Sequence, residues 1–326
     1  MVLVASEMAL LAHLLPEEHV GVVSVVELIA VGLSGARVYA VSSTRGELVL
    51  RVNAGGANAA RWAQQLRVLR RAAAHGIAPA IVHVDDTARA IVSTRAPGVP
   101  LVAGLMDPGQ RSAAIASVVD QLRALHAIDV IGIEERDPLV HAYEHAAAQR
   151  RRPGFPAWAA ALDPVFDSIA TTLARDPRRV VSHNDLNPAN VLWDGARAWL
   201  VDWEVAGLAH PFYDLAVLAM FLQLDDAAAL GLLARQEQRP VDDVMRATFA
   251  ALRRLAALFC GLVFASLVPD LNLLPASGPS LSEFYAGLRA GRLDLRDPGA
   301  RAAFALALLR LGTAREAAQP AGAPCS

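Results

Sequence analysis

Three acceptor side chains stand at fixed intervals near the middle of the chain: Asp185, Asn190 five residues later, and Asp202 twelve residues after that. Each lies beside a short apolar run of the kind that forms a strand. In phosphoryl transfer, one Asp can receive the proton of an attacking hydroxyl group, while an Asn and a second Asp hold metal ions on the nucleotide phosphates. Mg²⁺ prefers oxygen ligands, which an Asn carbonyl and an Asp carboxylate supply. The spacing therefore predicts a phosphoryl-transfer site, with Asp185 at the hydroxyl and Asn190 and Asp202 on the metal.

The residues around these side chains resemble the aminoglycoside phosphotransferase and choline/ethanolamine kinase superfamily, which shares the protein-kinase-like fold. The motifs that carry the resemblance lie within residues 182–216 and are His183-Asn184-Asp185 with Asn190, Asp202-Trp203-Glu204, and Pro211-Phe212-Tyr213-Asp214-Leu215-Ala216. The order of expected elements fits the same family over nearly the whole chain. The resemblance implies a kinase that uses ATP and Mg²⁺. It also implies that Glu204, two residues after the metal-binding Asp as in choline kinases, is a further metal or substrate contact.

The resemblance assigns roles to three neighbouring side chains. Asn187 is expected to brace the catalytic loop or to touch the γ-phosphate, so we count it among the nucleotide-binding residues. His183 is expected to fix the loop against the Asp202 segment through hydrogen bonds. Asp214 is expected to support the loop from beneath, and its place after Pro211 also suits a carboxylate at a helix N-terminus. Both interpretations of Asp214 are structural.

The elements that must position these residues begin with a strand-rich N-terminal part. Residues 1–20 suggest a short leading helix. Apolar runs bounded by turns predict strands, and one helical pattern over residues 57–75 ends at Gly76, a suitable C-terminal cap. The strands are expected at residues 22–30, 36–42, 47–52, 80–84 and 88–94. Five strands with one helix after the third are the arrangement of a kinase-like N-lobe.

The remainder of the chain has mainly helical patterns, after a hinge-like stretch at residues 95–100. Helices are expected at residues 110–127, 156–175, 211–235, 240–268, 279–290 and 298–317. We therefore predict an α+β, protein-kinase-like fold with two lobes. A five-stranded antiparallel N-lobe would take residues 1–95, and a mainly helical C-lobe would take residues 96–326.

Two places in the expected N-lobe could contact nucleotide phosphates. The turn between the first two strands is predicted to cover them, with the Ser34 hydroxyl and backbone N–H groups near Gly35 available. Arg51 on the third strand stands where the family usually has a Lys, and all 30 basic residues of this chain are Arg. The family also has a Glu partner in the following helix, but only Gln64 or Gln65 is available here. A Gln accepts a hydrogen bond but cannot neutralise Arg51.

Composition narrows the class of protein further. A net charge of −2 gives no indication of nucleic acid. Two cysteines and the absence of a positively charged leader favour a reducing, cytoplasmic setting. The longest apolar run, residues 255–268, is too short to span a bilayer and is expected to be a buried helix. No membrane partner is expected, and the oligomeric state stays open.

The most specific interpretation is an ATP- and Mg²⁺-dependent kinase of a small hydroxyl compound. Acidic and aromatic side chains suit a cationic alcohol, so choline or ethanolamine is the first choice, with thiamine or an aminoglycoside also open. The candidate aromatics for the pocket wall are Trp203, Phe212, Tyr213, Phe284 and Tyr285.

Two alternatives remain from the sequence. A nucleotide-binding pseudokinase or regulatory module is favoured by the missing helix Glu and disfavoured by the intact Asp185, Asn190 and Asp202. A hydrolytic metal site leaves the five-stranded N-lobe unexplained. Its candidate ligands are His183, Asp185, Asp202, His210 and Asp214.

Overall fold

The computed structural model describes residues 11–31, 35–53, 58–155, 162–274 and 278–314. The chain forms two compact units. The first comprises residues 1–136, 179–214 and 235–238, and the second comprises residues 137–178, 215–234 and 239–326. The predicted lobe boundary between residues 95 and 96 stays a prediction.

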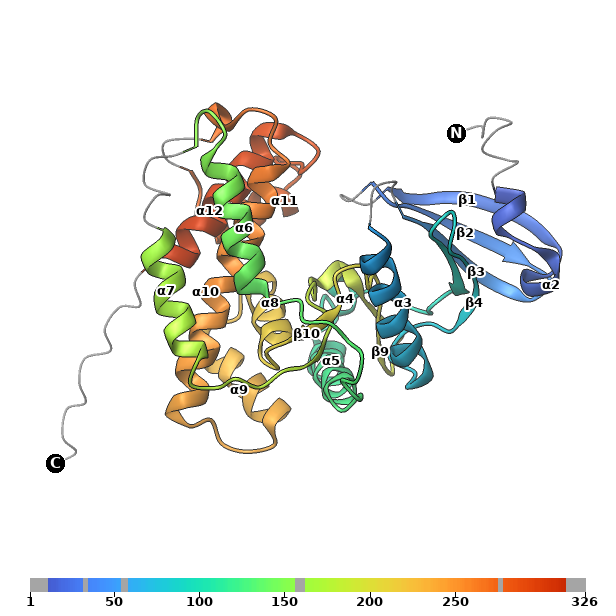
Figure 1. Ribbon diagram of the computed structural model, residues 1–326, viewed down its shortest axis with the longest axis horizontal. Helices are drawn as coiled ribbons and strands as arrows, with labels where there is room; N and C mark the ends of the chain where they lie inside the picture. The colour runs from blue at the N-terminus through green and yellow to red at the C-terminus, as the bar shows by residue number, and fades with distance from the viewer. Residues whose placement is uncertain (1–10, 32–34, 54–57, 156–161, 275–277, 315–326) are drawn as a thin grey trace. The chain divides into compact units, whose positions relative to one another are not determined.

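A five-stranded antiparallel sheet is the centre of the N-terminal part of the first unit, with strand order β1-β2-β3-β5-β4 (Figure 1). Its strands are β1 (Val23–Val31), β2 (Arg37–Ser43), β3 (Gly46–Val52), β4 (Ile81–Asp85) and β5 (Ala90–Thr94). All five predicted strands are confirmed, with boundaries shifted by up to two residues.

The alternation of side chains along β3 decides which residue faces the candidate site. Leu48, Leu50 and Val52 are buried on one face, where they join a core with Leu11 and Leu14 of the N-terminal helical segment. Because successive side chains of a strand point to opposite faces, Arg51 lies on the other face. The register places Arg51 opposite Val38 of β2 and Ile91 of β5.

Helix α3 (Ala59–Ala74) follows β3 and agrees with the helix predicted at residues 57–75. The Asn58 side chain caps its first turn by accepting a hydrogen bond from the Arg61 N–H at 2.8 Å. Gly76, with φ of +67°, ends the helical stretch, because a left-handed conformation costs glycine little. The leading segment contains helical residues 11–14 and the short helix α2 (Glu17–Val20).

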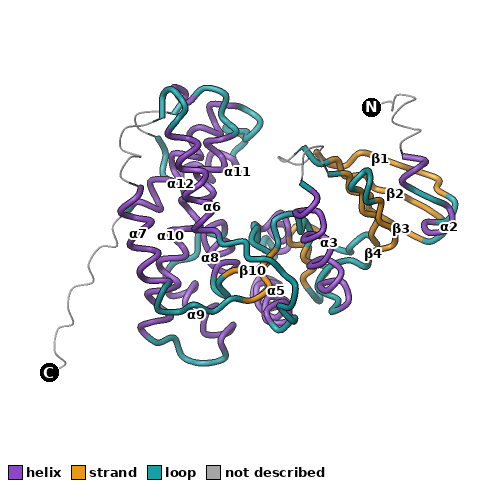
Figure 2. Tube along the Cα trace, viewed as in Figure 1, coloured by secondary structure: helices purple, strands orange, loops and turns teal. Residues whose placement is uncertain are grey.

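The motif region of the first unit consists of short strands and turns, which Figure 2 shows as orange segments among teal loops. They are β7 (Val180–Ser182), the 3-10 turn η2 (Pro188–Asn190), β8 (Val191–Trp193), β9 (Ala198–Leu200) and β10 (Gly207–Ala209). β7 pairs with β10, and β8 pairs with β9 and with β6 (Val99–Pro100). Helices α4 (Leu101–Gly104) and α5 (Pro108–His126) also belong to this unit.

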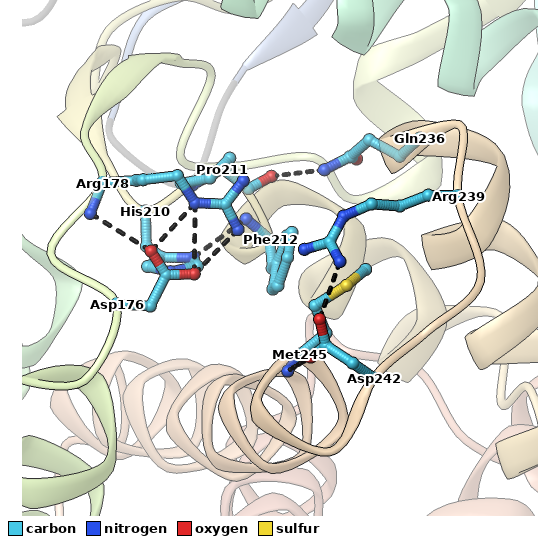
Figure 3. A network of polar contacts seen from close by, with 9 residues as sticks. All are labelled: Asp176, Arg178, His210, Pro211, Phe212, Gln236, Arg239, Asp242 and Met245. Atoms are coloured by element: carbon cyan, nitrogen blue, oxygen red, sulfur yellow. Dashed lines mark hydrogen bonds and ion pairs between the residues drawn. The ribbon is translucent and has the colours of Figure 1, made fainter.

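The second unit is helical, and α10 is its central helix. Its elements are α6 (Pro138–Arg150), α7 (Leu162–Leu173), most of α8 (Tyr213–Phe221) and α9 (Asp226–Glu237), α10 (Asp243–Ser266), η3 (Leu271–Leu273), α11 (Leu281–Arg289) and α12 (Pro298–Thr313). α10 packs against α6, α7 and α12. Asp242 caps its start and pairs with Arg239 at 2.7 Å (Figure 3). By length and composition α10 could cross a membrane, but 56% of its most apolar window is buried, as in a core helix.

Two helix predictions differ from the structure. The single helix expected over residues 211–235 is wrong: α8 ends at Phe221, Gln223 has a φ of +52°, and α9 begins at Asp226. The Asp225 carboxylate provides a local start signal for α9 by accepting from the Ala228 N–H at 2.8 Å. Helix α6 was not predicted, although Asp137 and Pro138 form a standard start signal.

Candidate active site

The loop between β7 and η2 holds Asp185 through two neighbouring amides. Asn190 Nδ2 donates to Asp185 Oδ2 at 2.8 Å and to the Asp185 main-chain oxygen at 2.9 Å. Asn187 Nδ2 donates to Asp185 Oδ1 at 3.3 Å. Both carboxylate oxygens are thus oriented by donors, and three of the predicted site residues lie together.

Asp214 supports this loop from the start of α8. Its buried carboxylate accepts from Ser182 Oγ at 2.7 Å, from the His183 N–H at 2.8 Å and from the Asn184 N–H at 2.7 Å. Asn184 has a φ of +66°, a conformation that Asn adopts more readily than most residues. One carboxylate therefore satisfies three consecutive donors and sets the direction in which the loop leaves β7.

His183 connects the loop to the segment that carries Asp202. Its Nε2 donates to the Val201 main-chain oxygen at 2.9 Å. Its ring packs against Trp203, with 4.7 Å between ring centroids. Asp202 itself has a φ of +67°. These contacts agree with the structural role expected for His183.

Arg51 extends from β3 to the two carboxylates of the Asp202-Trp203-Glu204 motif. Its Nη2 lies 2.6 Å from Glu204 Oε2 and 2.9 Å from Asp202 Oδ1. Its Nε donates to Asn53 Oδ1 at 3.0 Å. The charge partner that was sought within α3 is thus supplied by the motif segment, 153 residues further along the chain. No local sequence signal indicated this pairing.

The proton affinity of Asp185 is higher than that of an ordinary Asp. Partial burial disfavours the charged form and raises its pKa, and the nearby Asp202 carboxylate adds to the rise. His183 and the hydrogen bonds from Asn187 and Asn190 act in the opposite direction. The net direction is upward because removal from water is the largest effect.

The residues proposed for the metal fit a hard cation that arrives with phosphate ligands. Within the described part of the chain, no group of three or more His, Cys, Asp or Glu side chains could hold a metal alone. Asp202 Oδ1 is buried and lacks a hydrogen-bond partner among the described residues, since its 2.9 Å ion contact with Arg51 does not have hydrogen-bond geometry. Carboxylate and amide oxygens from Asp202, Glu204 and Asn190 suit Mg²⁺ when phosphates complete the shell.

Two further residues, Ser34 and Gly35, were predicted to cover the nucleotide phosphates. Ser34 lies outside the described residues. Gly35 is exposed between β1 and β2 with a φ of +81°. Its contact with phosphate stays a prediction.

Most of the aromatics considered for an acceptor pocket are core residues. Trp203, Phe212, Tyr213 and Phe284 are buried, and Phe284 stacks on Phe304 within the second unit. Packing accounts for these four side chains, so they do not support an aromatic wall for a cationic substrate.

The hydrolytic metal site finds no support in the described residues. Asp214 is occupied by three donors of the loop, and His210 Nδ1 accepts from the Phe212 N–H at 3.1 Å. Both side chains are thus engaged in structural contacts rather than directed toward a shared ion.

The antiparallel sheet, the braced loop that carries Asp185 and the carboxylates near Arg51 form the arrangement expected of a phosphotransferase with a protein-kinase-like fold. The profile of the phosphotransferase enzyme family, APH, matches residues 25–263. The chain belongs to this family.

Solved structures agree with the predicted α+β, kinase-like fold. A choline/ethanolamine kinase family protein from Mesorhizobium loti superposes with a TM-score of 0.70 at 19% identity, covering 95% of each chain. Choline kinase LicA from Streptococcus pneumoniae gives 0.61 at 17% identity, covering 79% of this chain and 90% of its own. An aminoglycoside-3′-phosphotransferase of type VIII gives 0.54 at 25% identity, covering 72% and 93%. A search of curated proteins finds no match.

Proposed function

We propose that this phosphotransferase moves the γ-phosphate of ATP to the hydroxyl group of a small molecule and requires Mg²⁺. The observation that carries the proposal is the gathering of Asp185, Asn190, Asp202 and Arg51 within one compact unit, in the contacts described above. Catalysis of this kind depends mainly on positioning and on charge neutralisation.

Each side chain has a role that its contacts support. Asp185, oriented by Asn187 and Asn190, accepts the proton of the incoming hydroxyl. Asn190, Asp202 and Glu204 provide the oxygen ligands for Mg²⁺, which when bound offsets the negative charge of the phosphates.

The remaining nucleotide contacts come from the sheet and the loop. Arg51 exchanges a carboxylate partner for a phosphate oxygen when the nucleotide enters. Ser34 and Gly35 cover the phosphates, and Asn187 is available to the γ-phosphate.

For the acceptor we propose an amino alcohol such as choline or ethanolamine. The acidic surroundings of Asp185 and the fold shared with choline and ethanolamine kinases support a cationic alcohol. An aminoglycoside is the second candidate, because the highest identity among the three structures compared above, 25%, is to an aminoglycoside-3′-phosphotransferase. Both acceptors carry positive charge and a free hydroxyl. The use of ATP suggests a cytoplasmic location.

A turnover screen tests the function directly. Purified protein is incubated with Mg·ATP and one of choline, ethanolamine, thiamine or an aminoglycoside, and ADP release is measured against an acceptor-free control. Acceptor-dependent ADP release, lost in Asp185→Asn, is the expected result. Nucleotide binding without turnover for any acceptor would instead favour the pseudokinase interpretation, and failure to bind Mg·ADP would refute both.

A further inference from the structure

We propose that Asn53 and Gln65 form a neutral relay that positions Arg51 for phosphate binding, an inference that rests on the proposed function. Neither residue belongs to the motifs that define the site. Both act through Arg51 and are therefore positioning residues.

The relay is a chain of two hydrogen bonds from helix α3 to the guanidinium. Gln65 Oε1 accepts from Asn53 Nδ2 at 2.8 Å, and Asn53 Oδ1 accepts from Arg51 Nε at 3.0 Å. The Gln65 side chain is 3% exposed, so water does not readily replace it. Since a buried amide without its partner is costly, this arrangement favours one orientation of Asn53 and hence of Arg51.

The two ends of the guanidinium have separate tasks in this geometry. Nε is held by the relay, whereas Nη2 contacts the Glu204 and Asp202 carboxylates. Nη2 can therefore change its partner from carboxylate to phosphate while Nε keeps its hydrogen bond to Asn53. Because the guanidinium is planar and rigid, fixing Nε also fixes the direction in which the Nη groups point.

The absence of a carboxylate on α3 is consistent with this division. Arg51 already has two negative partners, and a third on the helix would hold it more strongly against transfer to phosphate. The neutral amides of Asn53 and Gln65 orient the Arg51 guanidinium without adding a negative charge that would compete with phosphate. The Gln at this helix position thus orients Arg51 while Glu204 and Asp202 supply the charge.

Gln64 provides a matched control on the same helix. It is 4% exposed and forms two hydrogen bonds with the Glu134 backbone, one from Nε2 to the carbonyl and one from the Glu134 N–H to Oε1, each 3.1 Å. Loss of its amide removes two hydrogen bonds that connect α3 to Glu134. Gln64 does not contact Asn53 or Arg51 in the hydrogen bonds described.

Calorimetric titration with Mg·ADP and with adenosine tests the relay. Gln65→Leu should weaken Mg·ADP by about 5-fold and adenosine by less than about 2-fold, because only the phosphate contact depends on Arg51. Asn53→Leu should have the same selective effect. Gln65→Glu keeps an acceptor for Asn53 but adds a third negative charge near Arg51, so it should weaken Mg·ADP by about 2- to 5-fold while the Arg51 Nε–H group stays ordered. Gln64→Leu should lower the thermal unfolding temperature but leave the ratio of the two affinities unchanged.

The NMR signal of the Arg51 Nε–H group, assigned by its loss in Arg51→Lys, tests the same relay without nucleotide. Its order parameter should fall in Gln65→Leu and Asn53→Leu and stay at the wild-type value in Gln64→Leu. An unchanged signal in the first two variants overturns the relay whatever the binding data. If the signal changes but the Mg·ADP affinity does not, the relay does not position Arg51 for phosphate. The same conclusion follows if Gln64→Leu weakens Mg·ADP as much as Gln65→Leu does. If wild type binds no Mg·ADP, the proposed function fails, whereas the NMR comparison still decides whether the relay exists.

Discussion

At the residue scale, the central feature of the site is the concentration of charge around Arg51. Its side chain is 15% exposed and lies between two carboxylates that are each 30% exposed. Pairs of this kind, partly removed from water, interact more strongly than exposed surface pairs, for which the net contribution is often below about 1 kcal/mol. Truncating Arg51 would leave the Glu204 and Asp202 carboxylates without their shared cation, so two acidic groups of the proposed site depend on one basic residue.

Replacement of Arg51 should affect phosphate binding selectively. Arg51→Ala should weaken Mg·ADP by about 10- to 100-fold and adenosine little, since charge-assisted hydrogen bonds to phosphate are lost. Arg51→Lys should restore only part of the affinity because an ammonium group cannot contact Asn53 and a phosphate through a rigid fork. Calorimetry measures both, with Arg70→Ala, an exposed position on α3, as the control. Equal loss for ADP and adenosine would show that Arg51 acts on the fold instead of the phosphates.

Asp185 should matter for turnover far more than for nucleotide affinity. Asp185→Asn removes the proposed proton acceptor but keeps the size of the side chain, so kcat should fall by about 10²- to 10⁴-fold while the Mg·ADP dissociation constant changes little. Steady-state kinetics with the acceptor found in the screen, combined with calorimetry, check this. Near-wild-type turnover would move the catalytic role to another group.

At the scale of elements, the loop that carries Asp185 depends on a helix start that lies about 30 residues away in sequence. Strand β7 delivers Ser182 and His183 to the Asp214 carboxylate, and the His183 ring then reaches the segment before Asp202. Short strands alone would not fix this loop, because β7 and β10 pair over only three residues. Side-chain hydrogen bonds supply the rigidity that the short ladders lack.

Asp214→Asn should therefore damage both stability and catalysis. The amide offers one acceptor oxygen to three donors, so the unfolding free energy should fall by about 2–4 kcal/mol and kcat should fall as well. Asp194→Asn is the matched control, because the Asp194 carboxylate also accepts from three donors, Ala196 N, Arg197 N and Trp199 Nε1, in a turn between β8 and β9. Urea unfolding and kinetics on both variants separate the roles. If Asp194→Asn lowered kcat as much as Asp214→Asn, the loss would reflect general destabilisation.

At the scale of the whole molecule, a partly buried histidine in each unit, His83 and His145, should make stability depend on pH. Burial lowers the pKa of His83 in the first unit, and the stacked His19 ring, with 4.7 Å between centroids, lowers it further. His13 acts in the same direction, while Asp85 and Glu18 oppose it. Burial likewise lowers the pKa of His145 in the second unit, with His141 adding to the effect and Glu144 opposing it.

The sign of the pH effect follows from which state binds protons first. Below the ordinary histidine pKa of 6.5 the unfolded chain takes up protons that the folded protein excludes, so stability is full above pH 6.5 and declines as the pH falls below it. Urea unfolding at pH 7.5 and 5.5 should show lower stability at 5.5. His83→Gln and His145→Gln should each reduce the difference, and His75→Gln, at the exposed end of α3, serves as the control. An unchanged pH dependence in both test variants would contradict this explanation.

Local sequence signals were sufficient for much of the fold. Alternating apolar runs such as Leu48, Leu50 and Val52 predict strands from local sequence, because a period of two places these side chains on one face of a strand. The catalytic-loop motif also identified the neighbourhood of Asp185, Asn190 and Asp202, since these residues are close in sequence and linked by short strands. The division of residues 211–235 into α8 and α9 was not predicted, because both halves have helical composition and the break is marked only by the positive φ of Gln223 and the Asp225 cap.

Contacts between residues far apart in sequence were decided by the tertiary structure. The sequence shows that α3 offers Gln64 and Gln65 in place of a Glu, but not that Gln65 reaches Arg51 through Asn53 while Gln64 binds the Glu134 backbone. Nor does it show that Glu204 neutralises Arg51, a pair separated by 153 residues. Local patterns depend on backbone geometry over a few residues, whereas these partners are chosen by the packing of β3, α3 and the motif segment within one unit. The sequence by itself therefore determined which groups are present for phosphoryl transfer. The fold determined which of them form ion pairs with Arg51 and which orient its guanidinium group.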